Sequence, residues 1–157
     1  MTPQQIILGS VTFLHDLFTA IWIGGLVFLS ISLIPVSKKD LGDGMQTNKL
    51  MDAILKTHSQ YVYASILGLF ITGIIQARMS PSFSGLMRFD SAYSSLITVK
   101  HWLTFTMVAI ALFRSIAGRK KPGQADLHKM KLSLTLIHVN SVLGVLVLLL
   151  SGMLSTL

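Results

Sequence analysis

The stretch FLHDLFTAIWIGGLVFL, from Phe13 to Leu29, places a histidine and an aspartate inside a run of apolar residues. A helix that spans a membrane needs about 20 mostly apolar residues, and in hydrocarbon only helices and closed barrels satisfy their own backbone hydrogen bonds. The apolar pattern here extends over about residues 6–36. We therefore expect a transmembrane helix that carries His15 and Asp16 within the membrane.

The rest of the chain has the composition of a membrane protein. Of its 157 residues, 52% are hydrophobic and 12% are charged, whereas a soluble domain has about 25% charged residues. Three more apolar runs, at about residues 61–76, 96–117 and 132–157, are too long and too apolar for strands, and we expect their helices to cover about residues 50–77, 95–117 and 130–156. The sequence thus predicts an all-α, polytopic membrane protein: a single domain over residues 1–157, built as an up-down-up-down bundle of four transmembrane helices.

The charged residues predict how this bundle is oriented. Ten of the thirteen Lys and Arg residues flank the first and third connections: Lys38, Lys39, Lys49, Lys56, Arg114, Arg119, Lys120, Lys121, Lys129 and Lys131. By the positive-inside rule these connections face the cytoplasm. We therefore expect a multi-pass protein of the cell (plasma or inner) membrane with both termini outside, and the net charge of +7 reflects topology rather than nucleic-acid binding.

Local signals refine the ends of the first helix. MTPQQIILGS lacks the basic region of a removable signal peptide, so we interpret this segment as part of a retained first span. Pro35 is expected to end that span, and LGDG, residues 41–44, to form a turn. The loop at residues 77–95 is rich in Ser, Pro and Gly and is long enough to fold over one mouth of the bundle.

The sequence contains no cysteine. This excludes disulfides, thiolate metal sites, iron–sulfur clusters and covalent haem attachment through Cys-x-x-Cys-His. A metal ion or haem would be held by His, Met or oxygen ligands.

The predicted topology places four histidines at two depths. At 1.5 Å per residue, His15 lies about 13 Å and His101 about 8 Å below the outer edge of the membrane. His58 lies at the inner edge, and His138 about 9 Å above it. Two neutral imidazoles at one depth on diagonal helices can hold a b-type haem, so His15 with His101 is the candidate for an outer haem iron site and His58 with His138 for an inner one. His128 falls in the basic cytoplasmic loop, where we expect a solvated side chain.

Helical periodicity favours histidines that face the interior. Residues three, four or seven apart share a face, and three such stripes contain a histidine: His58, Ser65, Thr72 and Gln76; Thr98, His101 and Thr104; and Thr135, His138 and Ser141. Small hydroxylated faces also serve close helix packing in lipid. Interhelical hydrogen bonding and proton relay are therefore alternatives to metal ligation for each histidine.

Asp16 and Lys100 are the other candidate functional residues. Asp16 is turned about 100° from His15 on the helix, toward a neighbouring helix or a polar pocket. Lys100 lies at a similar depth and is its opposite charge. We interpret the two residues as proton or substrate partners, with a structural ion pair as the alternative.

Two further features have weaker functional meaning. Trp22 lies on the His15 face, and Gly24 with Gly25 allows close helix approach or makes room for a flat porphyrin. Met79 and Met87 are candidate thioether ligands for copper.

Several of these residues resemble known membrane families. HDLFTAIWIGGLVFLSISLIP is similar to the His, Trp, Gly-Gly opening of CopD-type domains and, more distantly, to the opening helix of HemJ-type protoporphyrinogen oxidases. LGLFITGI resembles the Leu-Thr-Gly segment of CopD domains, and ITVKHWLTFTMVAIALFR the lysine-bearing third helix of both groups. His101, Trp102 and Leu103 resemble the His-Trp-Leu of four-helix di-haem b-type cytochromes. HemJ-type sequences differ at Gly24-Gly25 and Phe113-Arg114.

The resemblance implies a haem-binding or copper-linked four-helix membrane protein. Our main hypothesis is a b-type cytochrome with one or two haems, held by the histidines named above, that exchanges electrons with a quinone or a redox protein in the lipid bilayer. One alternative is a membrane oxidoreductase that oxidises protoporphyrinogen or quinol, with Asp16 and Lys100 at the substrate. Another is a CopD-like copper transport or handling protein without haem. A last alternative is a structural subunit, and self-association into an oligomer is compatible with all of these.

Overall fold

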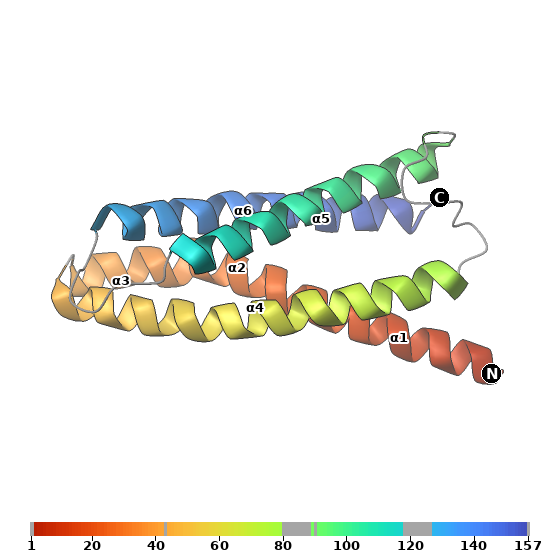
Figure 1. Ribbon diagram of the computed structural model, residues 1–157, viewed down its shortest axis with the longest axis horizontal. Coiled ribbons are helices and arrows are strands. Elements are labelled where there is room, and N and C mark those ends of the chain that lie inside the picture. Colours follow the sequence, from red (N-terminus) through yellow and green to blue (C-terminus); the bar gives the residue numbers. More distant parts are fainter. Residues whose placement is uncertain (1, 43, 80–88, 90, 118–126, 157) are drawn as a thin grey trace.

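The computed structural model describes residues 2–42, 44–79, 89, 91–117 and 127–156. All regular structure in these ranges is helical (Figure 1). The first span, Pro3–Leu41, is one continuous rod of five consecutive segments: α1 (Pro3–Thr19), the π-helical η1 (Ala20–Gly24), α2 (Gly25–Phe28), the π-helical η2 (Leu29–Leu33) and α3 (Ile34–Leu41). The other helices are α4 (Met45–Met79), α5 (Ala92–Ala117) and α6 (Leu127–Leu154).

Within the described residues, four helices are long and apolar enough to cross a membrane: Pro3–Leu41, Gln46–Met79, Ala92–Ile116 and Met130–Leu154. This confirms the prediction of an all-α polytopic membrane protein. Most of the helices extend beyond the ranges expected from hydropathy, because polar first and last turns continue the backbone ladder outside the apolar part. His128, which we expected in a loop, lies in the first turn of α6.

The helices form two antiparallel pairs. The first span packs along α4, and α5 packs along α6, while α2 brings the first span against α6. α4 also contacts α5, whereas the first span has little contact with α5 and α4 has little contact with α6, so these last two pairs lie diagonally in the bundle. Figure 1 shows the two pairs diverging toward the end that carries both termini. The antiparallel order follows from the short connections.

Glycines allow the closest approaches between these helices. A Cβ built on Gly144 of α6 would lie 2.9 Å from Ile23 Cγ2, and one on Gly68 of α4 would overlap the Phe18 ring. In lipid there is no hydrophobic force between helices, so close packing at small residues supplies much of their association. The side chains that fill the remaining centre of the bundle include Trp22, Leu26, Met107 and Ile137, all buried.

Pro35 does not end the first helix, contrary to our prediction. Proline lacks an N–H donor and its ring collides with the carbonyl four residues earlier. Here the π-helical turn η2 immediately precedes α3, and Pro35 occupies the first turn of α3. The Ile34 N–H bonds to the Leu29 carbonyl, five residues earlier, and this wider turn accommodates the proline ring, so the helix continues to Leu41.

The first span ends at a glycine turn. Gly42 has φ 65°, in the left-handed region that favours glycine. The Thr47 hydroxyl donates to the Leu41 carbonyl over 3.1 Å, which satisfies one terminal carbonyl of α3. The turn thereby fixes where α4 begins.

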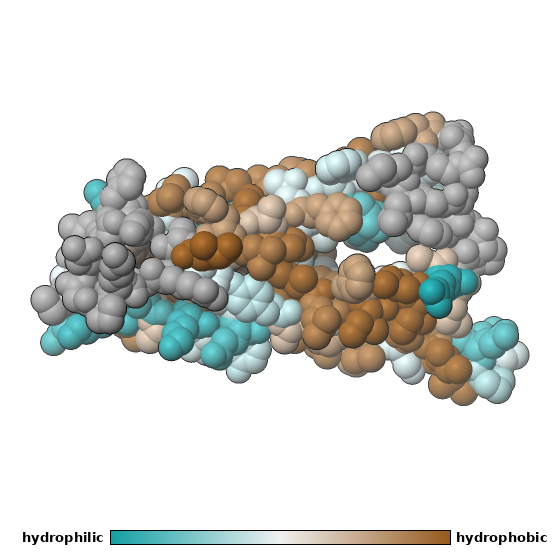
Figure 2. Space-filling view, in the orientation of Figure 1, coloured by the Kyte–Doolittle hydropathy of each residue, from teal (hydrophilic) through white to brown (hydrophobic). Residues whose placement is uncertain are grey.

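The surface of the bundle matches a lipid environment. Large apolar side chains are exposed along every span, among them Phe13, Phe28, Phe70, Trp102 and Ile116. On the face in Figure 2, hydrophobic side chains cover most of the middle, and hydrophilic ones gather toward the two ends. The chain is therefore a multi-pass membrane protein in contact with the bilayer.

Candidate functional site

His15 is anchored by α4. Its Nδ1 lies 2.9 Å from the Thr72 Oγ1, and the Thr72 hydroxyl donates its own hydrogen to the Gly68 carbonyl over 2.7 Å. The Thr72 oxygen therefore accepts the hydrogen bond, and His15 carries its proton on Nδ1. In a neutral imidazole this leaves Nε2 as a free lone pair, which is the form that ligates a metal.

His101 is anchored in the same way within its own helix. Its Nδ1 lies 2.7 Å from the Ile97 carbonyl oxygen. A carbonyl only accepts, so Nδ1 donates and Nε2 keeps its lone pair. Within the described part of the chain, neither His15 nor His101 has a hydrogen bond at Nε2.

The two rings belong to one electrostatic cluster at the end of the bundle that carries the termini. His101, Lys100 and Asp16 all act electrostatically on His15, and Asp16 also acts on Lys100. His15, His101 and Lys100 are half-buried and Asp16 is exposed. The expected proximity of Asp16 and Lys100 is present as a long-range interaction, and no direct ion pair joins them in the described ranges.

The space around this cluster is partly open. A Cβ on Gly73 would lie 3.9 Å from His15 Cε1, which is ordinary contact, so the absence of a side chain there leaves room beside the ring. Figure 2 shows an opening between the two helix pairs toward this end of the molecule. The seam between α1 and α4 is closed above His15, where the Gln76 amide donates to the Thr12 hydroxyl over 3.3 Å.

His58 lies nearer the middle of the bundle than His15, and its ring packs directly against Gly25 of the first span. A Cβ at Gly25 would come within 2.6 Å of His58 Nε2, so this imidazole occupies the volume that a side chain would take. Both ring nitrogens are buried without a hydrogen-bond partner among the described atoms. The His58 ring therefore faces the interior of the bundle, as the helical spacing predicted. Its role as a haem ligand remains a prediction.

His138 does not face the interior as we expected. The buried face of α6 contains Ile137, Asn140, Ser141 and Gly144, whereas Thr135 and His138 are exposed. His138 follows Ile137 by one residue and is therefore turned about 100° away from that face. The matched inner pair of His58 and His138 is not formed by this arrangement.

The sequence did not identify the anchors of the two outer histidines. The seven-residue spacing of His58, Ser65 and Thr72 correctly predicts one buried face on α4, but spacing alone does not show that Thr72 accepts from His15. The Ile97 carbonyl is a backbone group and leaves no residue-type signal at all. Arg114, buried near the end of α5, was counted only as a topology signal.

Other candidate ligands are not brought to the cluster. The described residues contain no group of three or more His, Cys, Asp or Glu side chains that could hold a metal ion. Met79 is half-buried at the end of α4, and Met87 lies outside the described residues, so their pairing as copper ligands stays a prediction. The same holds for most of the loop at residues 77–95.

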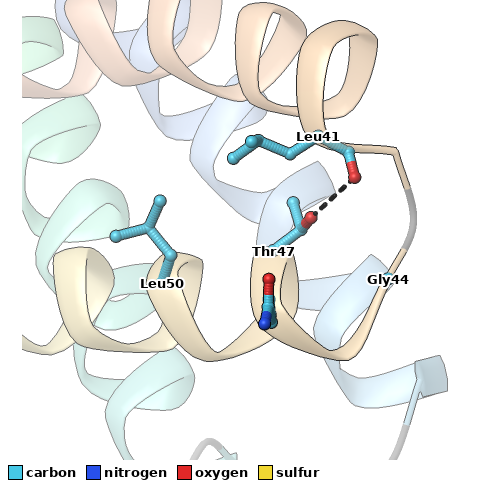
Figure 3. Close-up of a pocket in the computed structure, with 5 residues that line it drawn as sticks. Leu41, Gly44, Thr47 and Leu50 are labelled. Carbon is cyan, nitrogen blue, oxygen red and sulfur yellow. Dashed lines mark hydrogen bonds between the residues drawn. The ribbon is translucent and has the colours of Figure 1, made fainter.

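A pocket lies at the opposite end of the bundle, at the turn between α3 and α4. It has a volume of about 550 Å³ and is lined by Leu41, Gly44, Gln46, Thr47 and Leu50. In Figure 3 the Thr47 hydroxyl points to the Leu41 carbonyl and Leu50 lies one turn along α4. No predicted ligand lines this pocket.

Comparison with known proteins adds a family. The family model for copper resistance protein D, CopD, matches residues 52–154, about two thirds of the chain, including Lys100 and His101 but not His15. No curated protein and no solved structure matches the chain. The resemblance to CopD-type domains, first noted in the opening helix, is thus confirmed over the other three spans, and the chain belongs to the copper resistance protein D family.

Proposed function

We propose that this protein handles copper in the membrane and that His15 and His101 bind the ion between the first span and α5. The observation that supports the proposal is the tautomer of the two rings, since each Nδ1 is occupied by a hydrogen bond and each Nε2 is free. Such outer hydrogen bonds orient ligating histidines and raise their basicity. The name of the family, copper resistance, favours copper among the metals that imidazole binds.

A pair of neutral nitrogen donors suits copper in its reduced state. Copper(I) accepts low coordination numbers, whereas the higher coordination usual for other metals needs ligands that the described residues do not assemble here. Asp16 and Lys100 lie within electrostatic range of His15 and are groups of opposite charge type beside the proposed ion. We propose that Asp16 and Lys100 set the local charge that the ion meets, while the two imidazoles are already in the neutral form that ligates a metal.

A b-type haem held by the same two histidines is the second candidate. The diagonal placement of the first span and α5, together with the opening between the helix pairs in Figure 2, favours it. His15 and His101 would be the axial ligands, and the haem would supply one-electron transfer between a donor such as a quinol and an acceptor protein. Only one haem is proposed, because the exposed His138 leaves His58 without a partner ring.

One preparation distinguishes the two candidates. The protein is purified in detergent, its copper is measured by mass spectrometry, and oxidised and dithionite-reduced spectra are recorded. A colourless protein with stoichiometric copper supports copper handling. Sharp reduced α and Soret bands with a b-type pyridine haemochrome support the haem. Protein that holds neither, even after incubation with copper(I) or haemin, overturns both.

A further inference from the structure

Arg114 is a buried cation in the last turn of α5. Its side chain is only 9% exposed. Arginine stays protonated in proteins, so this residue cannot lower its burial cost by losing charge. A buried charge without a counter-charge is strongly destabilising, so buried charges are normally paired.

The protein itself supplies little compensation. The Arg114 Nε donates to the Ser133 Oγ over 3.4 Å, which is a long hydrogen bond to a neutral group. No carboxylate pairs with Arg114 within the described part of the chain. The whole sequence has six Asp and Glu residues against thirteen Lys and Arg, so acidic partners are scarce.

The groups around Arg114 are hydrogen-bond donors from a second helix. Tyr63 and His58, both on α4, lie within electrostatic range of the guanidinium. Tyr63 is half-buried, and the two ring nitrogens of His58 are buried without partners. Polar groups from α4 and α6 therefore lie near one buried cation of α5: Ser133 by a hydrogen bond, and Tyr63 and His58 within electrostatic range.

We propose that Arg114, assisted by Ser133, Tyr63 and His58, forms a binding site for a phosphate group. The guanidinium fork binds phosphate oxygens through parallel hydrogen bonds, and the neutral donors complete the remaining oxygens. Because Arg114 lies near the end of α5, the phosphate has two sources: the headgroup of an anionic lipid, or an inorganic phosphate ion. Basic pockets between transmembrane helices hold lipid headgroups in this way. The site is separate from the His15 and His101 cluster.

The test measures ligand-dependent stability in detergent. The melting temperature of the purified protein is followed as inorganic phosphate is added at constant ionic strength, and separately as phosphatidylglycerol replaces phosphatidylcholine in mixed micelles. Wild-type protein is expected to gain stability in a saturable manner from at least one ligand, and Arg114→Gln is expected to lose that gain. Lys131→Gln, which removes an exposed charge from α6, is the matched control and should keep it.

Each outcome has a defined meaning. A gain from phosphate alone identifies a free anion, and a gain from phosphatidylglycerol alone identifies a headgroup. No gain in wild-type protein, or an equal gain in Arg114→Gln, overturns the proposal.

If Arg114→Gln does not fold, Arg114→Lys replaces it. This variant keeps the charge but loses the fork, and it should need severalfold more phosphate for half of the gain; an unchanged requirement overturns the proposal. Copper content should be unchanged in all variants, so this test fails or succeeds independently of the copper proposal.

Discussion

At the scale of single residues, the proposed site depends on which nitrogen of each imidazole carries the proton. The Thr72 hydroxyl and the Ile97 carbonyl fix both protons on Nδ1. Each Nε2 lone pair is thereby available without a change of tautomer, which lowers the cost of ligand binding. The following two predictions address the ligands and their anchors separately.

His15→Ala and His101→Ala should each abolish copper or haem binding, because each removes one of only two proposed donors. Bound metal and the visible spectrum are measured on purified protein. His138→Ala is the control, since this exposed histidine lies outside the cluster. Retention of full metal content in either His15→Ala or His101→Ala would show that the ligands lie elsewhere.

Thr72→Val should weaken metal binding about 10- to 100-fold while leaving the fold intact, since it removes the group that orients His15. The affinity is measured by competition with a copper chelator. Thr106→Val serves as control, because the exposed Thr106 hydroxyl bonds only to the Trp102 carbonyl of its own helix. Equal affinities of the two variants would contradict an orienting role for Thr72.

Residue type and spacing predicted much of this site but not all of it. His15, Asp16, Lys100 and His101 were identified because ionisable residues are rare in apolar spans, and their depths follow from the helix rise. His138 was misplaced because Thr135, His138 and Ser141 suggested a shared face, while packing against the first span and α5 buries the Ile137 face instead. The tertiary contacts of α6 decide which stripe turns inward.

At the scale of elements, the first span is positioned by the contact between Gly25 and His58. Gly25→Ala should destabilise the protein by about 1–3 kcal/mol, since the new Cβ would lie 2.6 Å from His58 Nε2. Gly24→Ala is the matched control, because a Cβ there meets nothing within 4 Å. Thermal unfolding in detergent compares the two, and equal melting temperatures would mean that His58 moves aside at no cost.

The limits of sequence reasoning for elements appear at Pro35. Proline is a reliable stop signal in a regular α-helix, because its clash with the preceding turn is local. A π-helical turn changes that local geometry, and no residue pattern in Leu29–Leu33 announces it. The hydropathy of the span was therefore predicted well, and its internal geometry was not.

At the scale of the whole molecule, hydropathy and charge predicted the all-α bundle because a bilayer permits few alternatives. The orientation in the membrane is still a prediction. The chain has no cysteine, so single cysteines report on sidedness. Thr2→Cys and Ser155→Cys should react with an impermeant maleimide on intact cells, and Lys49→Cys only after lysis. The reverse pattern would place the termini inside.

The π-helical segments also determine where the length of the first span can change. A π turn holds one residue more than the α turn it replaces, while the helix on either side keeps its phase. Deleting the exposed Ala20 of η1 should therefore let that turn revert to α-helix, leaving His15 and Leu26 on their original faces. α4 has no π-helical turn that could absorb a deletion, so removing its exposed Ala64 would rotate every following residue by about 100° relative to the preceding ones. The yield of monodisperse protein should fall only for the second deletion, so shortening is tolerated at the irregular turn and not in the regular helix.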